Sequence, residues 1–434
     1  MFNIKKTLFF IIAIFLISSG ALFYFTYFEG EPPSIVLQPS IKYINPTTQF
    51  NLQVSDKKQG LKSVNIFIKQ NKNEIPLLHK KFNKLNYSEI KFKLPTTKLR
   101  PGKFILFIEA QDSSLKNFGQ GNIALIKKEF IYDPVPPQLS LLSRTHYLNQ
   151  GGSGLIVFKA NEPIKNAGVK LNNYFFPAYY NKKQNRYYCL FAWPYNLNKN
   201  HTPVLLAEDI AGNIAKVEFY YHLNPKKFPH DKINISNNFL SKKIPYFQHY
   251  FPEIKDNLQL FLKVNRILRQ ANREELKKIG LNTSTYALFK GKFKRLPNAA
   301  RKASFGEIRD YFYQGKKIDR QTHLGLDLAS IARAKVPASN TGKVVFADEM
   351  GIYGKVVILD HGLGLQTLYA HLSEIKVNVG QIVKKGSIIG RTGATGLAGG
   401  DHLHFAVLVS GIPVNPVEWL DLHWLKNNIY DRLP

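Results

Sequence analysis

The first strong pattern along the chain is an uncharged apolar run from Leu8 to Phe28, preceded by two lysines and followed by acidic residues. As a helix, this run would be about 30 Å long, enough to cross the hydrocarbon core of a bilayer. It is longer than the apolar part of a typical signal peptide and lacks a convincing small-x-small cleavage site before Leu22. We therefore expect residues 1–33 to form a cytoplasmic tip and an uncleaved, single-pass anchor in the cytoplasmic membrane. Lysines on the short N-terminal side predict that the rest lies in the periplasm or outside the cell.

Alternating apolar and polar positions dominate the next two hundred residues. Val64–Ile68 and Phe104–Ile108 carry apolar side chains two residues apart, and turns rich in Pro, Gly, Asn and Asp separate such segments. Many short strands at this spacing predict β-sandwiches. We expect two of them, residues 34–134 and residues 135–230, joined at a proline-rich junction.

A weak internal repeat supports this duplication. Asp112 followed by Gly121-Asn122 in the first segment resembles Asp209 followed by Gly212-Asn213 in the second, with an aromatic strand after each. The modules resemble the immunoglobulin-like repeats of bacterial surface proteins. We expect them to act as spacers rather than ligand-binding modules.

The apolar period then changes from two to three or four, which is typical of one helix face. Residues 231–300 are therefore predicted to be a helical connector, with Gly280 as a C-terminal cap. The predicted apolar face of its helix consists of Leu258, Phe261, Val264, Leu268 and Ala271. β patterning returns in residues 301–425, which predict a compact C-terminal β domain. Residues 426–434 are expected to be a tail, and the fold class is mainly β.

Charge and cysteine content narrow the setting. The formal net charge is +30, spread along the chain rather than gathered in one tail. Such a charge attracts anionic polymers or membrane surfaces. Because the chain is expected outside the cytoplasm, we predict acidic envelope polymers and lipid headgroups as the available anions, and no nucleic acid. The single cysteine, Cys189, excludes an intrachain disulfide and is expected at a buried strand position.

Histidine and aspartate cluster in the C-terminal β domain. The candidates are His323, Asp327, His371, His402 and His404. The spacings of four and two are even, and even spacing on extended backbone places side chains on one face of a sheet. Two imidazoles on one strand face are costly to bury unless each meets a metal, a substrate or a hydrogen-bond partner.

The motifs around these residues resemble the lysostaphin/LytM-type zinc metallopeptidases, which cleave peptides of bacterial peptidoglycan. The resemblance covers about residues 304–420 and includes FGEIRD, HLGLD, KVVILDHGLGLQTLYAHL, GRTGATG and DHLHFAVLVSG. It implies a LytM-type fold, the duplicated hybrid motif, for the C-terminal domain. One departure is Ala406, where an acidic residue is frequent in the family.

Carried over position by position, the resemblance implies one Zn²⁺ per chain, held by His323, Asp327 and His404. It implies that His371 and His402 face the open coordination position and assist catalysis. None of the five is substituted, which favours an active enzyme. The sequence does not divide the catalytic work between His371 and His402.

The expected function is that of a membrane-anchored zinc metalloendopeptidase, a hydrolase that cleaves peptidoglycan crosslinks through a zinc-activated water. The alternative is a non-enzymatic module that binds the wall or activates another cell-wall hydrolase. The stretch from Val379 to Gly386 also resembles the turn of lipoyl/biotinyl-type β domains, a similarity that concerns fold rather than function. A regulatory protein partner, the oligomeric state and the bond cleaved stay open.

Overall fold

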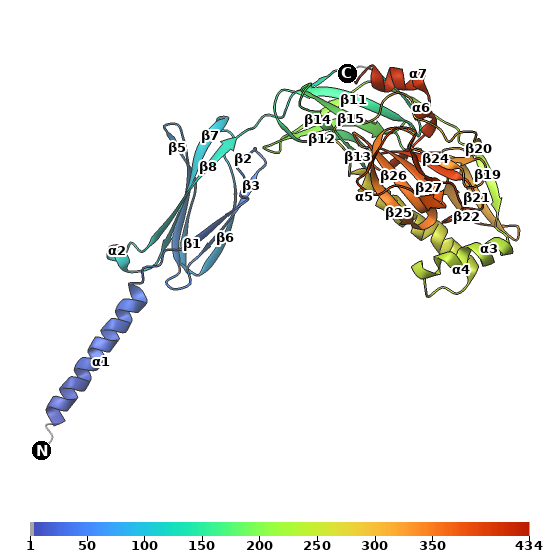
Figure 1. Cartoon of the computed structure of the whole chain (residues 1–434). Coiled ribbons are helices and arrows are strands. Elements are labelled where there is room, and N and C mark those ends of the chain that lie inside the picture. Colours follow the sequence, from blue (N-terminus) through green and yellow to red (C-terminus); the bar gives the residue numbers. More distant parts are fainter. Residues whose placement is uncertain (1–3, 144, 434) are drawn as a thin grey trace. The chain divides into compact units, whose positions relative to one another are not determined.

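The computed structural model describes residues 4–143 and 145–433 (Figure 1). Internal contacts divide the chain into two units, residues up to 136 together with 208–214, and residues 137–207 together with 215–434. The finer domain boundaries expected from the sequence stay predictions. The two units are described separately below.

The N-terminal helix α1 (Ile4–Tyr27) carries the apolar run. Its stretch Lys6–Tyr27 has a mean hydropathy of 2.4, and none of it is buried against the rest of the chain. Its length and composition suit a membrane span, and a signal sequence near an N-terminus shares both properties.

The rest of the first unit consists of two sheets, in which alternate side chains point into one core. Their strand orders are β1-β3-β6 and β2-β8-β7-β4-β5. Val64, Ile66 and Ile68 of β4 are fully buried, as the alternation predicted. The elements are β1 (Ser34–Gln38), β2 (Tyr43–Ile44), β3 (Gln49–Ser55), β4 (Leu61–Gln70), β5 (Asn73–Leu85), β6 (Tyr87–Lys93), β7 (Gly102–Asp112), α2 (Lys116–Gly119) and β8 (Ile123–Tyr132).

The second strand-rich region contains two four-stranded sheets, ordered β14-β15-β11-β9 and β13-β12-β16-β17, and the parallel pair β10-β18. Cys189 is fully buried on β15, at the strand position expected for it. The strands are β9 (Leu139–Leu141), β10 (His146–Asn149), β11 (Ser153–Ala160), β12 (Ile164–Leu171), β13 (Tyr174–Pro177), β14 (Tyr179–Asn181), β15 (Arg186–Ala192), β16 (Val204–Asp209), β17 (Ile214–Glu218) and β18 (Tyr221–Asn224). The mainly β class is thus confirmed, whereas the immunoglobulin-like character stays a prediction.

The two turns of the suspected repeat share one side-chain arrangement. Asp112 accepts hydrogen bonds from the backbone N–H and the side-chain amide of Asn122, both at 2.7 Å. Asp209 accepts the same pair from Asn213, at 2.9 and 2.8 Å. Each asparagine amide also donates to a backbone carbonyl in the segment that precedes a strand-rich region, Glu29 O or Asp133 O. The repeated residues therefore fasten the two linkers in the same way.

The helical connector contains α3 (Asn237–Lys243), the 3-10 helix η1 (Ile244–Tyr250), α4 (Asn257–Lys263), the π-helical turn η2 (Val264–Leu268) and α5 (Arg269–Gly280). The predicted apolar face is correct as far as Leu268 and wrong at Ala271, which is exposed. A π turn inserts one extra residue and shifts the helix face, so that Asn272 is buried instead.

The sequence suggested Gly280 as the C-terminal cap of this helix, but Gly280 does not adopt the left-handed conformation of a glycine cap. It is the last residue of α5, and Leu281 follows as the cap. A Cβ at Gly280 would lie 2.2 Å from the backbone nitrogen of Gly411. The glycine is needed there for close backbone approach to the C-terminal domain.

The C-terminal domain is built on one large sheet, ordered β20-β23-β31-β27-β26-β25-β29, with β32 paired to β31. Two three-stranded sheets, β19-β21-β22 and β24-β30-β28, flank it. The strands are β19 (His230–Asn234), β20 (Ala300–Ala303), β21 (Ile308–Tyr313), β22 (Lys316–Thr322), β23 (Leu326–Ala329), β24 (Lys335–Pro337), β25 (Gly342–Met350), β26 (Gly354–Gly362), β27 (Leu365–Leu372), β28 (Glu374–Ile375), β29 (Ile382–Val383), β30 (Ile388–Arg391), β31 (Leu403–Val409) and β32 (Ile412–Val414).

Both faces of this sheet are covered. On β31, Leu403, Phe405 and Val407 belong to the core shared with the second strand-rich region. Ala406 and Leu408, on the other face, pack in a core that the sheet forms with the connector helices. Two of these helices, α3 and α4, are labelled in Figure 1. Ala406 is therefore a core residue, and an acidic side chain at this position would be buried against helices.

Three short elements lie after β32: α6 (Pro416–Leu420), α7 (Leu422–Leu425) and the π turn η4 (Lys426–Tyr430). A 3-10 turn, η3 (Gly351–Tyr353), lies between β25 and β26. Glu418 of α6 is buried and accepts hydrogen bonds from the Asn149 side chain at 2.8 Å and the Ser153 backbone N–H at 3.0 Å. Burial raises the pKa of Glu418 to about 7. This carboxyl group joins the C-terminal domain to β10 and β11.

Candidate metal centre

Adjacent strands bring the five predicted site residues together. Asp327 on β23 and His404 on β31 are directly opposed in the antiparallel register, so their side chains share a face. His404 is in turn opposite Ala370 on β27, one residue before His371. His402 lies just before β31 and forms an isolated bridge with Gly393.

His323 reaches the same place from a loop, not from a continuous strand. β22 ends at Thr322 and β23 begins at Leu326, so the even spacing of His323 and Asp327 does not act through extended backbone. Instead, the His323 backbone N–H donates to Glu307 O at 2.9 Å and His323 O accepts from Gly306 N–H at 2.7 Å. These two bonds fix the loop beside β21.

His371 owes its position to a β-bulge. Val357 pairs with Tyr369 and Lys355 with Leu372, so β27 has one more residue than β26 across this step. His371 adopts φ +60°, a left-handed conformation that is rare for a residue other than glycine. Alternation along a regular strand would send His371 to the face opposite Ala370. The bulge turns it toward the histidine cluster, where its ring centroid is 5.9 Å from that of His404.

Three donor atoms converge at the centre of the cluster. His323 Nε2, Asp327 Oδ1 and His404 Nδ1 lie 2.9 Å from one another in all three pairs. All three side chains are buried. His323 Nδ1 donates to Ser304 O at 2.9 Å, which leaves Nε2 with its lone pair toward the other two atoms. Buried lone pairs this close repel one another unless a proton or a cation lies between them, so the set fits a divalent metal.

The other two imidazoles border this centre. His371 Nδ1 donates to Thr395 O and His402 Nδ1 donates to Gly400 O, both at 2.9 Å. His402 Nε2 lies 3.6 Å from Asp327 Oδ1. The His371 and His402 rings are 4.9 Å apart between centroids. Both rings therefore have Nδ1 held by a backbone carbonyl and Nε2 available to the cleft.

The electrostatics of the cluster favour an ionised Asp327 beside two neutral imidazoles, those of His371 and His404. Burial would raise the pKa of Asp327, but His323, His402 and His404 hold it well below its usual range. Burial and the neighbouring histidines lower the pKa of His371 well below its usual range, and burial lowers that of His404 to about 4. Neutral imidazole and ionised carboxylate are the forms that bind metal.

Arg309 is a residue that the sequence analysis did not single out, although the motif FGEIRD contained it. Its Nη2 donates to Asp327 Oδ2 at 2.9 Å, and its Nε donates to Glu307 Oε1 at 3.0 Å. Asp327 thus keeps Oδ1 for the centre while Oδ2 is held from behind. The available signal was the spacing of Glu307 and Arg309, which are two residues apart at the start of β21.

Gly325 is a second residue that the sequence analysis missed. A Cβ at this position would lie 2.6 Å from Cε1 of His404 and 2.8 Å from Phe405 O. No side chain fits there without displacing the His404 ring.

The centre opens into a cleft of about 970 Å³. One wall is the glycine-rich stretch of residues 393–400, which includes Ala394 and Gly400. Another wall comes from the connector and includes Ser236 and Lys243. Lys243 Nζ donates to Ala394 O across the cleft. Two tyrosines lie near these elements: Tyr353 lines the cleft, whereas Tyr369 is a core residue, hydrogen-bonded to Ser339 and Thr367.

Comparisons with known proteins agree on the C-terminal domain. Residues 321–416 match Peptidase family M23. Over 95 residues the chain is 42% identical to the DD-carboxypeptidase/endopeptidase Mpg of Neisseria meningitidis, and over 96 residues it is 38% identical to the peptidoglycan DD-endopeptidase ShyB of Vibrio cholerae. Each match covers 22% of both proteins, so the chain spans about a fifth of the length of these relatives.

Among solved structures, the catalytic domain of the antimicrobial peptidase lysostaphin from Staphylococcus simulans is 30% identical to this chain. The match covers 30% of this chain and 98% of that domain, with a TM-score of 0.26. The matched family segment contains all five residues of the cluster.

Proposed function

The chain carries a LytM-type peptidase M23 domain at its C-terminus, and on this premise we propose that it is a zinc metalloendopeptidase that hydrolyses peptide crosslinks of bacterial peptidoglycan. The observation that carries the proposal is the convergence of three buried donor atoms beside two further imidazoles. Relatives named as DD-endopeptidases support a cell-wall hydrolase.

The donor set suits zinc, which binds imidazole nitrogen and carboxylate oxygen and keeps an open position in catalytic sites. His323 Nε2, Asp327 Oδ1 and His404 Nδ1 would hold it. When bound, zinc supplies Lewis-acid polarisation of the scissile carbonyl and lowers the pKa of water from about 15.7 toward about 7. Arg309 and the Ser304 carbonyl keep two of these ligands in place.

His371 and His402 are the groups available for proton transfer. Because each Nδ1–H is engaged by a backbone carbonyl, each Nε2 is the atom that meets substrate. Together they can orient the attacking water, stabilise the oxyanion of the tetrahedral intermediate and return a proton to the leaving amine. The bulge at His371 keeps its ring in this position before substrate arrives.

The cleft suits an extended, acidic peptide. Lys242 and Lys302 are exposed on its rim and have no carboxylate partner among the described residues. Free carboxylates of a wall peptide would offset their charge. We further propose that α1 anchors the chain in the cytoplasmic membrane and that the two strand-rich regions set the reach of the peptidase domain.

The test is incubation of the purified chain with purified peptidoglycan, with and without chelator, followed by mass spectrometry of the released fragments. We expect crosslinked fragments to be converted to uncrosslinked ones, and we expect chelation to stop this and zinc to restore it. Unchanged wall together with stimulation of a second hydrolase would show instead that the domain is a non-enzymatic activator.

A further inference from the structure

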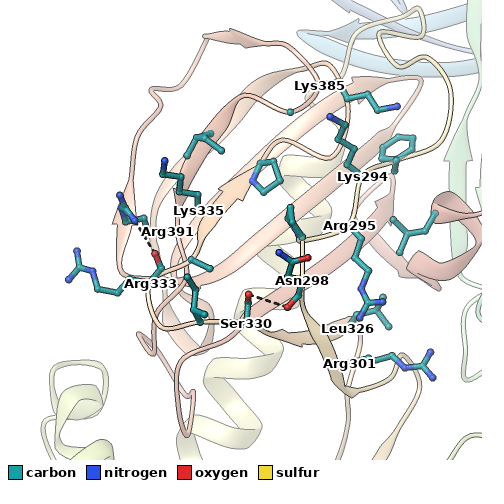
Figure 2. Close-up of a pocket in the computed structure, with 18 of the residues that line it drawn as sticks. Lys294, Arg295, Asn298, Arg301, Leu326, Ser330, Arg333, Lys335, Lys385 and Arg391 are labelled. Atoms are coloured by element: carbon teal, nitrogen blue, oxygen red, sulfur yellow. Dashed lines mark hydrogen bonds between the residues drawn. The ribbon is translucent and has the colours of Figure 1, made fainter.

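A second cavity of the C-terminal domain, about 1260 Å³ in volume, has no part in the chemistry described above. Its walls come from the end of the connector (residues 292–298), from β20, from the loop before β24 and from the turn between β29 and β30. Figure 2 shows lysine and arginine side chains on several sides of this cavity, which we call the groove. The consecutive residues Arg301 and Lys302 of β20 line this groove and the metal cleft, respectively.

The groove carries a dense, uncompensated positive charge. Eight lysine and arginine side chains line it, and none of the described lining residues is an aspartate or a glutamate. Among the described residues, no hydrogen bond or ion pair engages the charged groups of five of them, which are Lys292, Lys294, Arg301, Arg333 and Lys335. Charged side chains left free in this way are available to a ligand.

The three remaining cations are held in place by the groove itself. Arg295 donates to Ala299 O, Lys385 donates to Lys292 O, and Arg391 donates to Arg333 O and pairs with Glu374 outside the groove. Burial and the charges of Lys294 and Lys292 lower the pKa of Lys385. The fold therefore holds like charges close together, which costs stability unless an anion binds.

The shape and the chemistry of the groove select the kind of anion. A single phosphate would meet two or three cations, so eight require a ligand with many closely spaced charges. The only aromatic side chain in the lining, Phe293, is 2% exposed, which leaves no stacking surface for bases. A concave site accepts a polymer chain, whereas a flat membrane surface would reach only its rim. Exposed apolar side chains such as Ile331 and Val417 can contact the carbon skeleton of such a chain.

We propose that this groove, lined by Lys294, Arg301, Arg333 and Lys335, is a docking site for a phosphodiester-linked anionic polymer of the cell envelope that carries no bases. Arginine forks and lysine ammonium groups pair with successive phosphates. Because the groove and the cleft share β20, a polymer bound here lies beside the metal centre. Binding does not depend on the proposed peptidase activity.

The test measures binding of fluorescent poly(glycerol phosphate) to the full chain in nanodiscs of zwitterionic lipid, after chelation, so that catalysis plays no part. The triple variant Lys294→Gln, Arg333→Gln, Lys335→Gln removes three free cations. The matched control, Lys278→Gln, Lys316→Gln, Lys426→Gln, removes three exposed lysines that line neither cavity. We expect at least about tenfold weaker binding for the groove variant, because three cations that pair with phosphates are lost, and little change for the control.

Three results would overturn the proposal. Equal losses in the two triple variants would mean that only the overall charge matters. Stronger, groove-dependent binding of single-stranded oligodeoxythymidylate would assign the groove to nucleic acid. Groove-dependent binding of phosphatidylglycerol vesicles, without binding of poly(glycerol phosphate), would assign it to a lipid surface.

Discussion

The C-terminal domain contains two cavities that use charged side chains in opposite ways. At the metal centre, the side chains of the cluster are held by second groups, as Asp327 is by Arg309 and His371 by the Thr395 carbonyl. In the basic groove, five of the eight lining cations, several of which Figure 2 labels, have no hydrogen-bond or ion-pair partner among the described residues. The metal centre is defined by three atoms that converge on one position, whereas the groove is defined by charges spread over a larger surface.

This difference predicts how each site responds to change. A centre in which three atoms lie 2.9 Å apart depends on position, so one substitution should abolish its function. A groove with eight cations depends on summed long-range charge, so single substitutions should have small, similar and salt-sensitive effects. The predictions below test this contrast in order of decreasing effect.

The largest effects are expected in the cleft. His404→Ala should lose both bound zinc and wall hydrolysis, because it removes one of the three proposed zinc ligands. His371→Ala should keep zinc and lose activity by about 100- to 10,000-fold, the usual range for a group that transfers protons. Metal analysis and a turbidity assay on purified wall measure the two. The surface histidine variant His423→Ala is the control and should match the parent chain. Normal turnover by His371→Ala would remove this residue from the mechanism.

A smaller loss is expected from the residue that positions a ligand. Arg309→Gln should weaken zinc binding by about 10- to 100-fold, because Asp327 loses the group that holds Oδ2. Competition with a chromogenic chelator measures this affinity. Arg320→Gln breaks a similar arginine–aspartate pair, with Asp310, on the same hairpin and away from the centre. An equal effect of both variants would mean that general destabilisation, not ligand positioning, is responsible.

Acid sensitivity should arise partly outside the cleft. Burial and the charge of Arg432 lower the pKa of His146 to about 4, below the value of 6.5 in an unfolded chain. Its contribution to stability is complete above pH 6.5 and is lost as the pH falls toward 4, by about 2 kcal/mol at pH 5. His146→Phe, placed among Phe191 and Phe219, should therefore show a smaller fall in Tm between pH 7 and pH 5. An unchanged profile would show that His146 does not contribute to acid unfolding.

The smallest effects are expected for single cations of the groove. Arg301→Gln or Lys335→Gln alone should weaken poly(glycerol phosphate) binding only about threefold, and the loss should shrink as salt rises from 50 to 300 mM, because shorter screening lengths weaken long-range attraction. Titrations at several salt concentrations measure this. A single substitution that abolished binding would erase the contrast, since the groove would then depend on one position as the cleft does.

The elements differ in how far the sequence predicted them. Strand alternation placed the buried residues of β4 and β7, because a period of two leaves a side chain no choice of face once one face is buried. The apolar run predicted α1, and the repeated Asp and Asn residues marked two turns that share one hydrogen-bond pattern. The connector was predicted to be helical, but the prediction of its buried face was wrong after η2, because the spacing of apolar residues does not reveal a π turn.

In the candidate centre, the sequence determined which residues are involved, and the resemblance assigned roles that stay predictions. The tertiary structure decided how they meet. Strand pairing sets Asp327 against His404, a loop held by backbone hydrogen bonds brings in His323, and a bulge turns His371 onto their face. Arg309, Gly325 and the basic groove emerged only from the fold. Side-chain identity is written locally in the sequence, whereas the distances between side chains that belong to different strands depend on register, bulges and the packing of both sheet faces.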